Sequence, residues 1–184
     1  MTDPDTASWI AALSTYSSTR EKILEHRFVA DITAELWARG VFDFAVSHSE
    51  VDNSGYDLIV EARGVTRHIQ LKAMHVRSRT AEFPVQARLE DKPSACVILM
   101  LHDARTLAIA QYRWFGAAPG AVLPSLGARM GKHSKANAQG IKSERPAIRR
   151  LEKRRFDTIG NVSALVDQLF GSHEQMLGST SVTS

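Results

Sequence analysis

Three polar side chains in the middle of the chain are of types that can hold a metal ion and a phosphate. Asp57 follows the turn-forming segment Ser54-Gly55-Tyr56 and precedes the apolar run Leu58-Ile59-Val60, and Gln70 and Lys72 stand two residues apart. Side chains two apart on a strand point to the same face. A carboxylate, an amide oxygen and an ammonium group suit a hard cation and a phosphate. The spacing therefore indicates a candidate site for phosphate chemistry.

A tight turn at Arg63-Gly64 is predicted to bring these side chains together. If these two residues form the loop of a hairpin, Ala62 pairs with Val65, and counting back sets Asp57 opposite Gln70. Opposed side chains lie about 5 Å apart and diagonal ones about 7–8 Å apart. The pattern predicts one cluster of all three polar side chains. Each motif alone is also typical of any strand with one solvated face.

The order of these motifs resembles that of the PD-(D/E)xK nuclease superfamily. The matching features are an acid-bearing helix, Gly55-Tyr56-Asp57 with its hydrophobic run, a turn, and Gln70-Leu71-Lys72. Gln in place of the usual acid is similar to the Mrr-like restriction nucleases. The resemblance covers roughly residues 20–115. It implies an α/β fold with a restriction-endonuclease-like core, in which helices flank a central mixed β-sheet in the order helix, three strands, helix, strand.

The resemblance also implies a role for each residue of the site. Asp57, the Gln70 side-chain oxygen, the Leu71 carbonyl and, through water, Glu25 would hold Mg²⁺, with Mn²⁺ as the alternative cation. Lys72 would orient or activate the attacking water. The expected activity is that of a metal-dependent DNA endonuclease of the restriction, repair or phage-defence type, acting on duplex or branched DNA. Cutting both strands of a duplex would call for a homodimer.

Gln70 departs from the superfamily's commonest pattern. A neutral amide oxygen can ligate a hard cation, but the site loses one negative charge. The alternative is therefore a catalytically inactive protein of the same fold that binds nucleic acid or serves as a structural subunit. A third hypothesis is an enzyme that acts on small acidic metabolites.

The helical acid requires a helix that faces the sheet. Ser18 and Glu21 match a capping box, which predicts a helix over 18–39 that ends before a glycine. Glu25 borders its apolar stripe, whereas Glu35 lies about 280° around the helix from Glu25 on a more polar side. Both acids stay candidates, and Glu25 is preferred. The stripe comprises Leu24, Phe28, Ile32 and Leu36, with Val29 alongside.

The rest of the chain supplies the other predicted elements. A first strand is expected over 41–46, a short helix over 83–91, strands over 94–101 and 106–115, and a last amphipathic helix that ends at Gly171. The expected organisation is an N-terminal segment (1–17), the α/β core (18–115), a loop with a basic helical extension packed on the core (116–171), and a disordered tail (172–184).

Positive charge is concentrated in one segment. The chain carries +3, but the stretch from Arg129 to Arg155 has ten basic residues against Glu144 and Glu152, a net of +8 that leaves −5 elsewhere. This asymmetry indicates a nucleic-acid partner, with a solvated basic helix as the alternative. Pro146 suits the first turn of a helix carrying the cluster. The residues expected to grip phosphates are Lys132, Lys135, Lys142, Arg145, Arg149, Arg150, Lys153, Arg154 and Arg155.

Composition agrees with a cytoplasmic enzyme. At 184 residues the chain has the length of one domain. Cys96 is the only cysteine, so no disulfide can form within one chain, and neither a signal peptide nor an apolar run of membrane-spanning length is present. The seven histidines lack the spacing of metal ligands. No nucleophile elbow or phosphate-binding glycine loop occurs.

Overall fold

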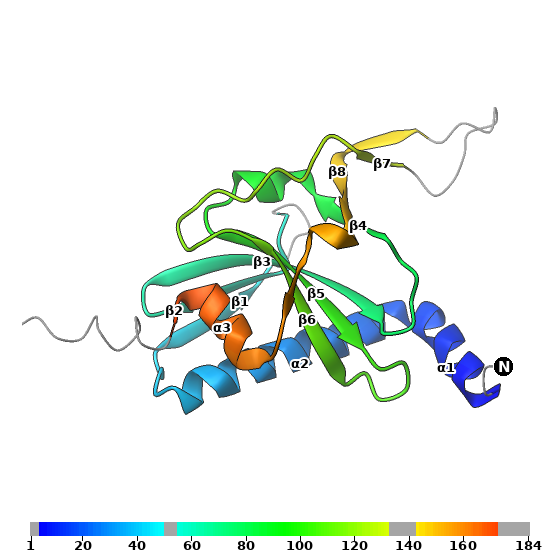
Figure 1. Ribbon diagram of the computed structural model, residues 1–184, viewed down its shortest axis with the longest axis horizontal. Helices are drawn as coiled ribbons and strands as arrows, with labels where there is room; N and C mark the ends of the chain where they lie inside the picture. The colour runs from blue at the N-terminus through cyan, green and yellow to red at the C-terminus, as the bar shows by residue number, and fades with distance from the viewer. Residues whose placement is uncertain (1–3, 50–54, 133–142, 173–184) are drawn as a thin grey trace, which may run out of the picture.

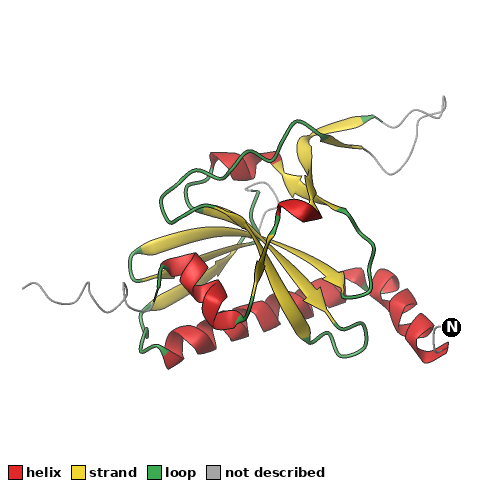
Figure 2. Ribbon diagram, viewed as in Figure 1, coloured by secondary structure: helices red, strands yellow, loops and turns green. Residues whose placement is uncertain are grey.

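The computed structural model describes residues 4–49, 55–132 and 143–172. Within these ranges the chain is an α/β protein with two β-sheets (Figures 1 and 2). Its α-helices are α1 (Pro4–Thr15), α2 (Ser17–Ala38) and α3 (Val162–Phe170), and its 3₁₀ helices are η1 (Ala87–Asp91) and η2 (Lys153–Arg155). No helix among the described residues is both long and apolar enough to cross a membrane.

The larger sheet has six strands in the order β1-β2-β3-β5-β6-β9. It is mixed: β3 and β5 run parallel, and all other neighbours are antiparallel. The parallel pair is possible because β4 and η1 carry the chain across the sheet between β3 and β5. The strands are β1 (Phe44–His48), β2 (Leu58–Ala62), β3 (Val65–His75), β5 (Ala95–His102), β6 (Ile109–Gly116) and β9 (Asp157–Ile159).

The smaller sheet has three antiparallel strands in the order β4-β8-β7. They are β4 (Glu82–Gln86), β7 (Met130–Lys132) and β8 (Glu144–Glu152). Figure 1 shows this sheet above the larger one, with α2 and α3 on the opposite side. The fold is therefore layered: helices, central sheet, small sheet.

Strand β5 joins two hydrophobic cores. All eight of its residues are buried, as expected for a strand covered on both faces. Cys96, Ile98 and Met100 pack with the helices, whereas Val97 and Leu99 pack with the small sheet. Burial raises the pKa of the Cys96 thiol to about 12, so this cysteine is an inert core residue.

The predicted hairpin and its register are confirmed. Arg63 and Gly64 form the loop, both with positive φ (49° and 76°), the backbone of a type I′ turn. Ala62 pairs with Val65, and Leu58 pairs with Ile69. The next pair along the chain would join Asp57 and Gln70, as the count from the turn predicted.

A buried arginine ties the last helix to the sheet. Arg67 of β3 is fully buried and donates to the carbonyls of Gln168 (2.9 Å) and Leu169 (2.5 Å) at the end of α3. It also donates to the Ala117 carbonyl (2.8 Å). The carbonyls of Gln168 and Leu169 are among those that a helix end leaves without intrahelical partners. The predicted end of this helix at Gly171 is confirmed, with φ of 94° at that glycine.

The start of the long helix and the first strand differ from prediction. Residues 4–15 are helical, and only Tyr16 separates α1 from α2, so Ser18 lies inside a nearly continuous helical segment and no side chain caps α2. The capping box was therefore wrong. Strand β1 occupies 44–48 in place of 41–46, because Val41 donates to the Leu36 carbonyl and extends the end of the helix.

Two predicted helices were also wrong. Residues 83–86 belong to β4, and only 87–91 form a 3₁₀ turn. The basic segment contains no α-helix among its described residues: Pro146, Arg149 and Arg150 lie in β8, whose Leu151 is fully buried, and Arg154 and Arg155 lie in η2. Pairing of β8 with β4 overrides the helical pattern. Lys135, Lys142 and all of the predicted tail (172–184) except Ser172 lie outside the described residues.

Candidate active site

A cleft of about 510 Å³ lies where α2, β3 and β4 meet. Its lining includes Glu25 of α2, Asp57 just before β2, and Leu71 and Lys72 of β3. We call this hollow the acid cleft. It brings together three segments that are far apart in the sequence, and four of the residues predicted for the site.

Asp57 is fixed to strand β3 by two hydrogen bonds. Its own N–H donates to the Ile69 carbonyl (2.8 Å), and its Oδ2 accepts from the Leu71 N–H (2.6 Å). A bond between an amide and a carboxylate is charge-assisted and therefore strong. The orientation of the Asp57 carboxylate is thus set by the backbone of the strand that carries Lys72.

Glycine two positions before Asp57 is required by the local packing. Gly55 has φ of +82°, in the region that side chains disfavour. A Cβ atom at this position would lie 2.9 Å from the Leu89 backbone nitrogen of η1. The Gly-x-Asp spacing therefore has a physical cause: the chain must pass close to η1 before it turns Asp57 into the cleft.

Strand β3 extends beyond the start of its neighbour β2, so its backbone groups are exposed at the sheet edge next to Asp57. β2 begins at Leu58, whereas β3 continues past Ile69 to His75. In an antiparallel pair the N–H and C=O of one residue point to the same side. Because the Leu71 N–H points to Asp57, the Leu71 carbonyl is directed toward the same edge.

The structure distinguishes the two candidate acids of α2. Glu25 lines the acid cleft with 13% of its side chain exposed, and it contacts Lys22 Nζ (2.9 Å) and His48 Nδ1 (3.2 Å). Glu35 instead pairs with Arg39 (2.8 Å), which also pairs with Asp167 of α3 (2.6 Å). The hydrogen bond from Arg39 lowers the pKa of Glu35. Of the two candidates, Glu25 is the one at the cleft, whereas Glu35 pairs with Arg39, which joins α2 to α3.

Gln70 is buried and hydrogen-bonded to β4. It is 3% exposed, its Oε1 accepts from the Gln86 N–H of β4 (3.1 Å), and it is not among the residues that line the cleft. Lys72, two residues further along the strand, lines the cleft. The predicted cluster is thus formed in part: the structure brings Asp57 and Lys72 together, while the Gln70 oxygen connects the two sheets.

The donor set of the acid cleft suits a hard cation. The carboxylates of Asp57 and Glu25 line it together with Leu71, and a third acid of the lining, Glu21, pairs with Arg20. Mg²⁺ prefers oxygen ligands, keeps several waters and often uses only one or two carboxylates. No cluster of three or more His, Cys, Asp or Glu side chains that could hold a metal occurs in the described part of the chain. The residues present therefore fit a Mg²⁺ ion bound largely through water.

Much of the basic segment is engaged in holding the small sheet. Arg129 and Arg150 both pair with Glu82 of β4, and Arg154 pairs with Glu152 (2.6 Å). The Arg155 guanidinium lies over the Phe115 ring at 4.8 Å and donates to the Ser125 carbonyl. Of the residues predicted to grip phosphates, Arg150, Arg154 and Arg155 thus have protein partners. The exposed residues of the segment include Lys132 and Arg145.

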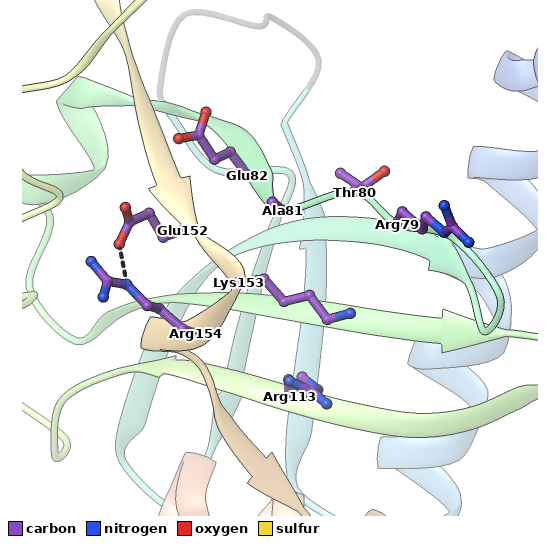
Figure 3. A pocket seen from close by; sticks show the side chains of 8 residues that line it. All are labelled: Arg79, Thr80, Ala81, Glu82, Arg113, Glu152, Lys153 and Arg154. Carbon is purple, nitrogen blue, oxygen red and sulfur yellow. Dashed lines mark hydrogen bonds and ion pairs between the residues drawn. The ribbon is translucent and has the colours of Figure 1, made fainter.

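A second hollow, of about 470 Å³, lies beside η2 and β4 (Figure 3). We call it the cation groove. Its lining comprises Arg79, Thr80, Ala81, Glu82, Arg113, Glu152, Lys153 and Arg154. Sequence reasoning included Lys153 and Arg154 but missed Arg79 and Arg113, which lie far from the basic segment. Only the charged stretch Arg77-Ser78-Arg79 gave a local signal.

Comparison with known proteins adds no relative. No family model matches the chain, and no curated protein matches it. The likeness to the PD-(D/E)xK superfamily therefore depends on the motif residues and on where the structure places them.

Proposed function

We propose that the protein is a metal-dependent DNA endonuclease and that the acid cleft is its active site. The main observation in support is that one cleft is lined by Asp57, Lys72, Leu71 and Glu25. An acid pair beside a lysine is the arrangement expected for hydrolysis of a phosphodiester, in which metal and cation share the charge of the phosphate.

The order of elements also supports a restriction-endonuclease-like core. Helix α2 is followed by β1, β2 and β3 and then by β5 in one mixed sheet. The resemblance implied the same order, with a helix between the third and fourth strands. In this chain β4 and η1 take the place of that helix. The described residues form one acid cleft, so a homodimer would be needed to cut both strands, and we include it in the proposal.

Each residue of the cleft has a role in the proposed reaction. The carboxylates of Asp57 and Glu25 and the Leu71 carbonyl would hold Mg²⁺ or Mn²⁺. The cation, when bound, would polarise the scissile phosphate and acidify a water. Lys72 would orient the attacking water or offset the charge that develops on the phosphate. The bond from the Leu71 N–H would keep the Asp57 carboxylate in position throughout.

A second candidate function is supported by the position of Gln70. Its amide oxygen accepts from the Gln86 N–H of β4, which leaves Asp57 and Glu25 as the carboxylates proposed to hold the metal. A protein that keeps the fold and binds nucleic acid without cutting it would have the same structure. The two candidates differ in a single property, which is metal-dependent cleavage.

Plasmid cleavage tests the proposal directly. Supercoiled plasmid and single-stranded DNA are incubated with the wild type, with Asp57→Ala and with Lys72→Ala, in Mg²⁺, Mn²⁺ or EDTA. Glu25→Gln and Glu35→Gln form a matched pair on one helix, because Glu35 pairs with Arg39 outside the cleft. We expect nicking that requires metal, that Asp57→Ala and Lys72→Ala abolish and that Glu35→Gln retains. DNA binding without cleavage in any metal would favour the second candidate.

A further inference from the structure

We propose that the cation groove is a phosphate-binding site for the nucleic-acid strand, separate from the acid cleft. The inference rests on the proposed function, because it assigns a second contact on the same substrate. The site would be formed by Arg79, Arg113 and Lys153, which come from the segment after β3, from β6 and from η2.

The three cations converge on one hollow. In Figure 3 the Lys153 side chain points into the space between Arg79 and Arg113, whereas Arg154 turns the other way, to Glu152. Arg113 and Lys153 are half-buried, and Arg113 Nε donates to Gln111 Oε1 (3.3 Å), a neutral partner that orients it. The cationic groups are therefore not spread over a convex surface but lie around a concave one.

The acids of the groove are already engaged. Glu82 pairs with Arg129 and Arg150, and Glu152 pairs with Arg154. Within the described ranges, no carboxylate lies within ion-pair distance of Arg79, Arg113 or Lys153. Like charges gathered at one place repel one another unless an anion lies between them. A phosphate suits this position, since arginine binds its oxygens in a bidentate manner and lysine adds a point charge.

The groove and the acid cleft are neighbours along β4. Glu82 lines the groove, and the next two residues, Phe83 and Pro84, line the cleft. A strand whose scissile phosphate lies in the cleft can therefore place another phosphate in the groove by crossing the start of β4. Contacts of this kind give affinity and register but carry no sequence information. A free phosphate or a small phosphate ester offers the same chemistry, and the test separates these sources.

Binding measured without divalent metal tests the groove independently of cleavage. A fluorescent oligonucleotide is titrated in EDTA at several salt concentrations with the wild type, Lys153→Gln, Arg113→Gln, and Arg105→Gln as a control cation on the turn between β5 and β6. We expect each groove variant to bind more weakly and to reduce the slope of log affinity on log salt by about 0.9 for duplex or about 0.7 for single strands. Arg105→Gln should match the wild type.

Two results would overturn the inference. One is an unchanged salt slope in both groove variants, with thermal unfolding showing that the variants are folded. The other is binding of inorganic phosphate that depends on Lys153 and Arg113 while oligonucleotide binding does not, which would indicate a site for small anions. Failure of the proposed function would look different, since the oligonucleotide would bind through the groove but no metal would support cleavage.

Discussion

The acid cleft and the cation groove are similar in size and adjoin the same strand, but they differ in how their charges are compensated. The cleft is lined by three acids and three bases, and its salt bridges Arg20–Glu21 and Lys22–Glu25 join them locally. The groove is lined by four bases and two acids, and both acids are paired. The cleft can thus hold a cation and a phosphate together, whereas the groove suits an anion alone.

The two hollows also differ in the rigidity of their supports. Asp57, Leu71 and Lys72 are fixed by a hairpin whose register is set by a two-residue turn, and Glu25 lies on a helix of 22 residues. The groove is formed by long side chains from a connecting segment, the middle of β6 and a single 3₁₀ turn. Rigid elements position reacting groups accurately, while flexible cations suffice for gripping a backbone. We therefore expect the acid cleft to serve the chemical step and the cation groove to serve binding of the DNA backbone. Substitutions should disrupt the two functions independently.

The largest effect is expected from Asp57→Asn. Asparagine retains an oxygen that can accept from the Leu71 N–H but removes the charge. We expect cleavage under single-turnover conditions to fall by a factor on the order of 10²–10⁴, the range typical of losing a group that acts in proton transfer or charge stabilisation. Oligonucleotide affinity in EDTA should stay at the wild-type value. Activity within tenfold of the wild type would remove Asp57 from the proposed mechanism.

A smaller effect is expected when the groove is reversed in charge. Lys153→Glu combined with Arg79→Glu should raise the KM for cleavage by about tenfold or more at moderate salt and leave kcat at saturating substrate unchanged, since phosphate contacts add uniform binding. Steady-state kinetics at two salt concentrations measure both constants. A fall in kcat alone would mean that the cation groove takes part in the chemical step, and that its assignment to backbone binding is wrong.

Gln70 lies between the two sheets and should affect stability more than chemistry. Gln70→Ala removes the acceptor of the Gln86 N–H, and an unpaired buried donor costs about 1–3 kcal/mol. Urea unfolding should show this loss in the free energy of unfolding. Gln70→Glu retains an acceptor and serves as the matched variant. If Gln70→Ala were as stable as the wild type but inactive, Gln70 would belong to the active site.

The smallest effect concerns Glu35, the acid of α2 that lies outside the cleft. Arg39 lowers the pKa of Glu35, so the stabilisation is complete above its ordinary pKa of 4.5 and is lost as the pH falls through the folded-state value. Glu35→Gln should be less stable than the wild type by about 0.2–1 kcal/mol near neutral pH, as for a partly exposed pair. That difference should shrink in urea titrations below pH 4.5. A difference that grows on acidification would contradict the assignment.

Local pattern was sufficient for the hairpin, the long helix and the last helix. Gly64 between two apolar runs indicated the turn at Arg63-Gly64, in which both residues have positive φ, and the turn determined the register. The apolar stripe of α2 is buried as predicted, and Glu25 borders it. In these elements each residue interacts mainly with neighbours a few positions away, so the periodicity of the sequence contains the information.

The basic segment shows where local pattern fails. Its buried residues Ile148 and Leu151 are three apart, a spacing that fits a helix as well as an irregular strand. What makes it a strand is β4, which pairs with it across some sixty residues of chain. The same strand, β4, contains Gln86, whose N–H donates to the Gln70 side-chain oxygen. The pairing partner of β8 and the hydrogen-bond partner of Gln70 thus both lie in β4, within or next to the segment 83–91 that was predicted to be a helix.

The sequence alone determined the candidate chemistry: Asp57 before an apolar run, Lys72 on a facing strand, and the turn that aligns them. Only the tertiary structure chose Glu25 over Glu35, directed Gln70 to β4, and assembled Arg79, Arg113 and Lys153 into one groove. The physical reason is distance along the chain. Backbone dihedrals and strand alternation act between near neighbours, whereas hydrogen bonds and charge compensation between sheets depend on which distant segments pack together.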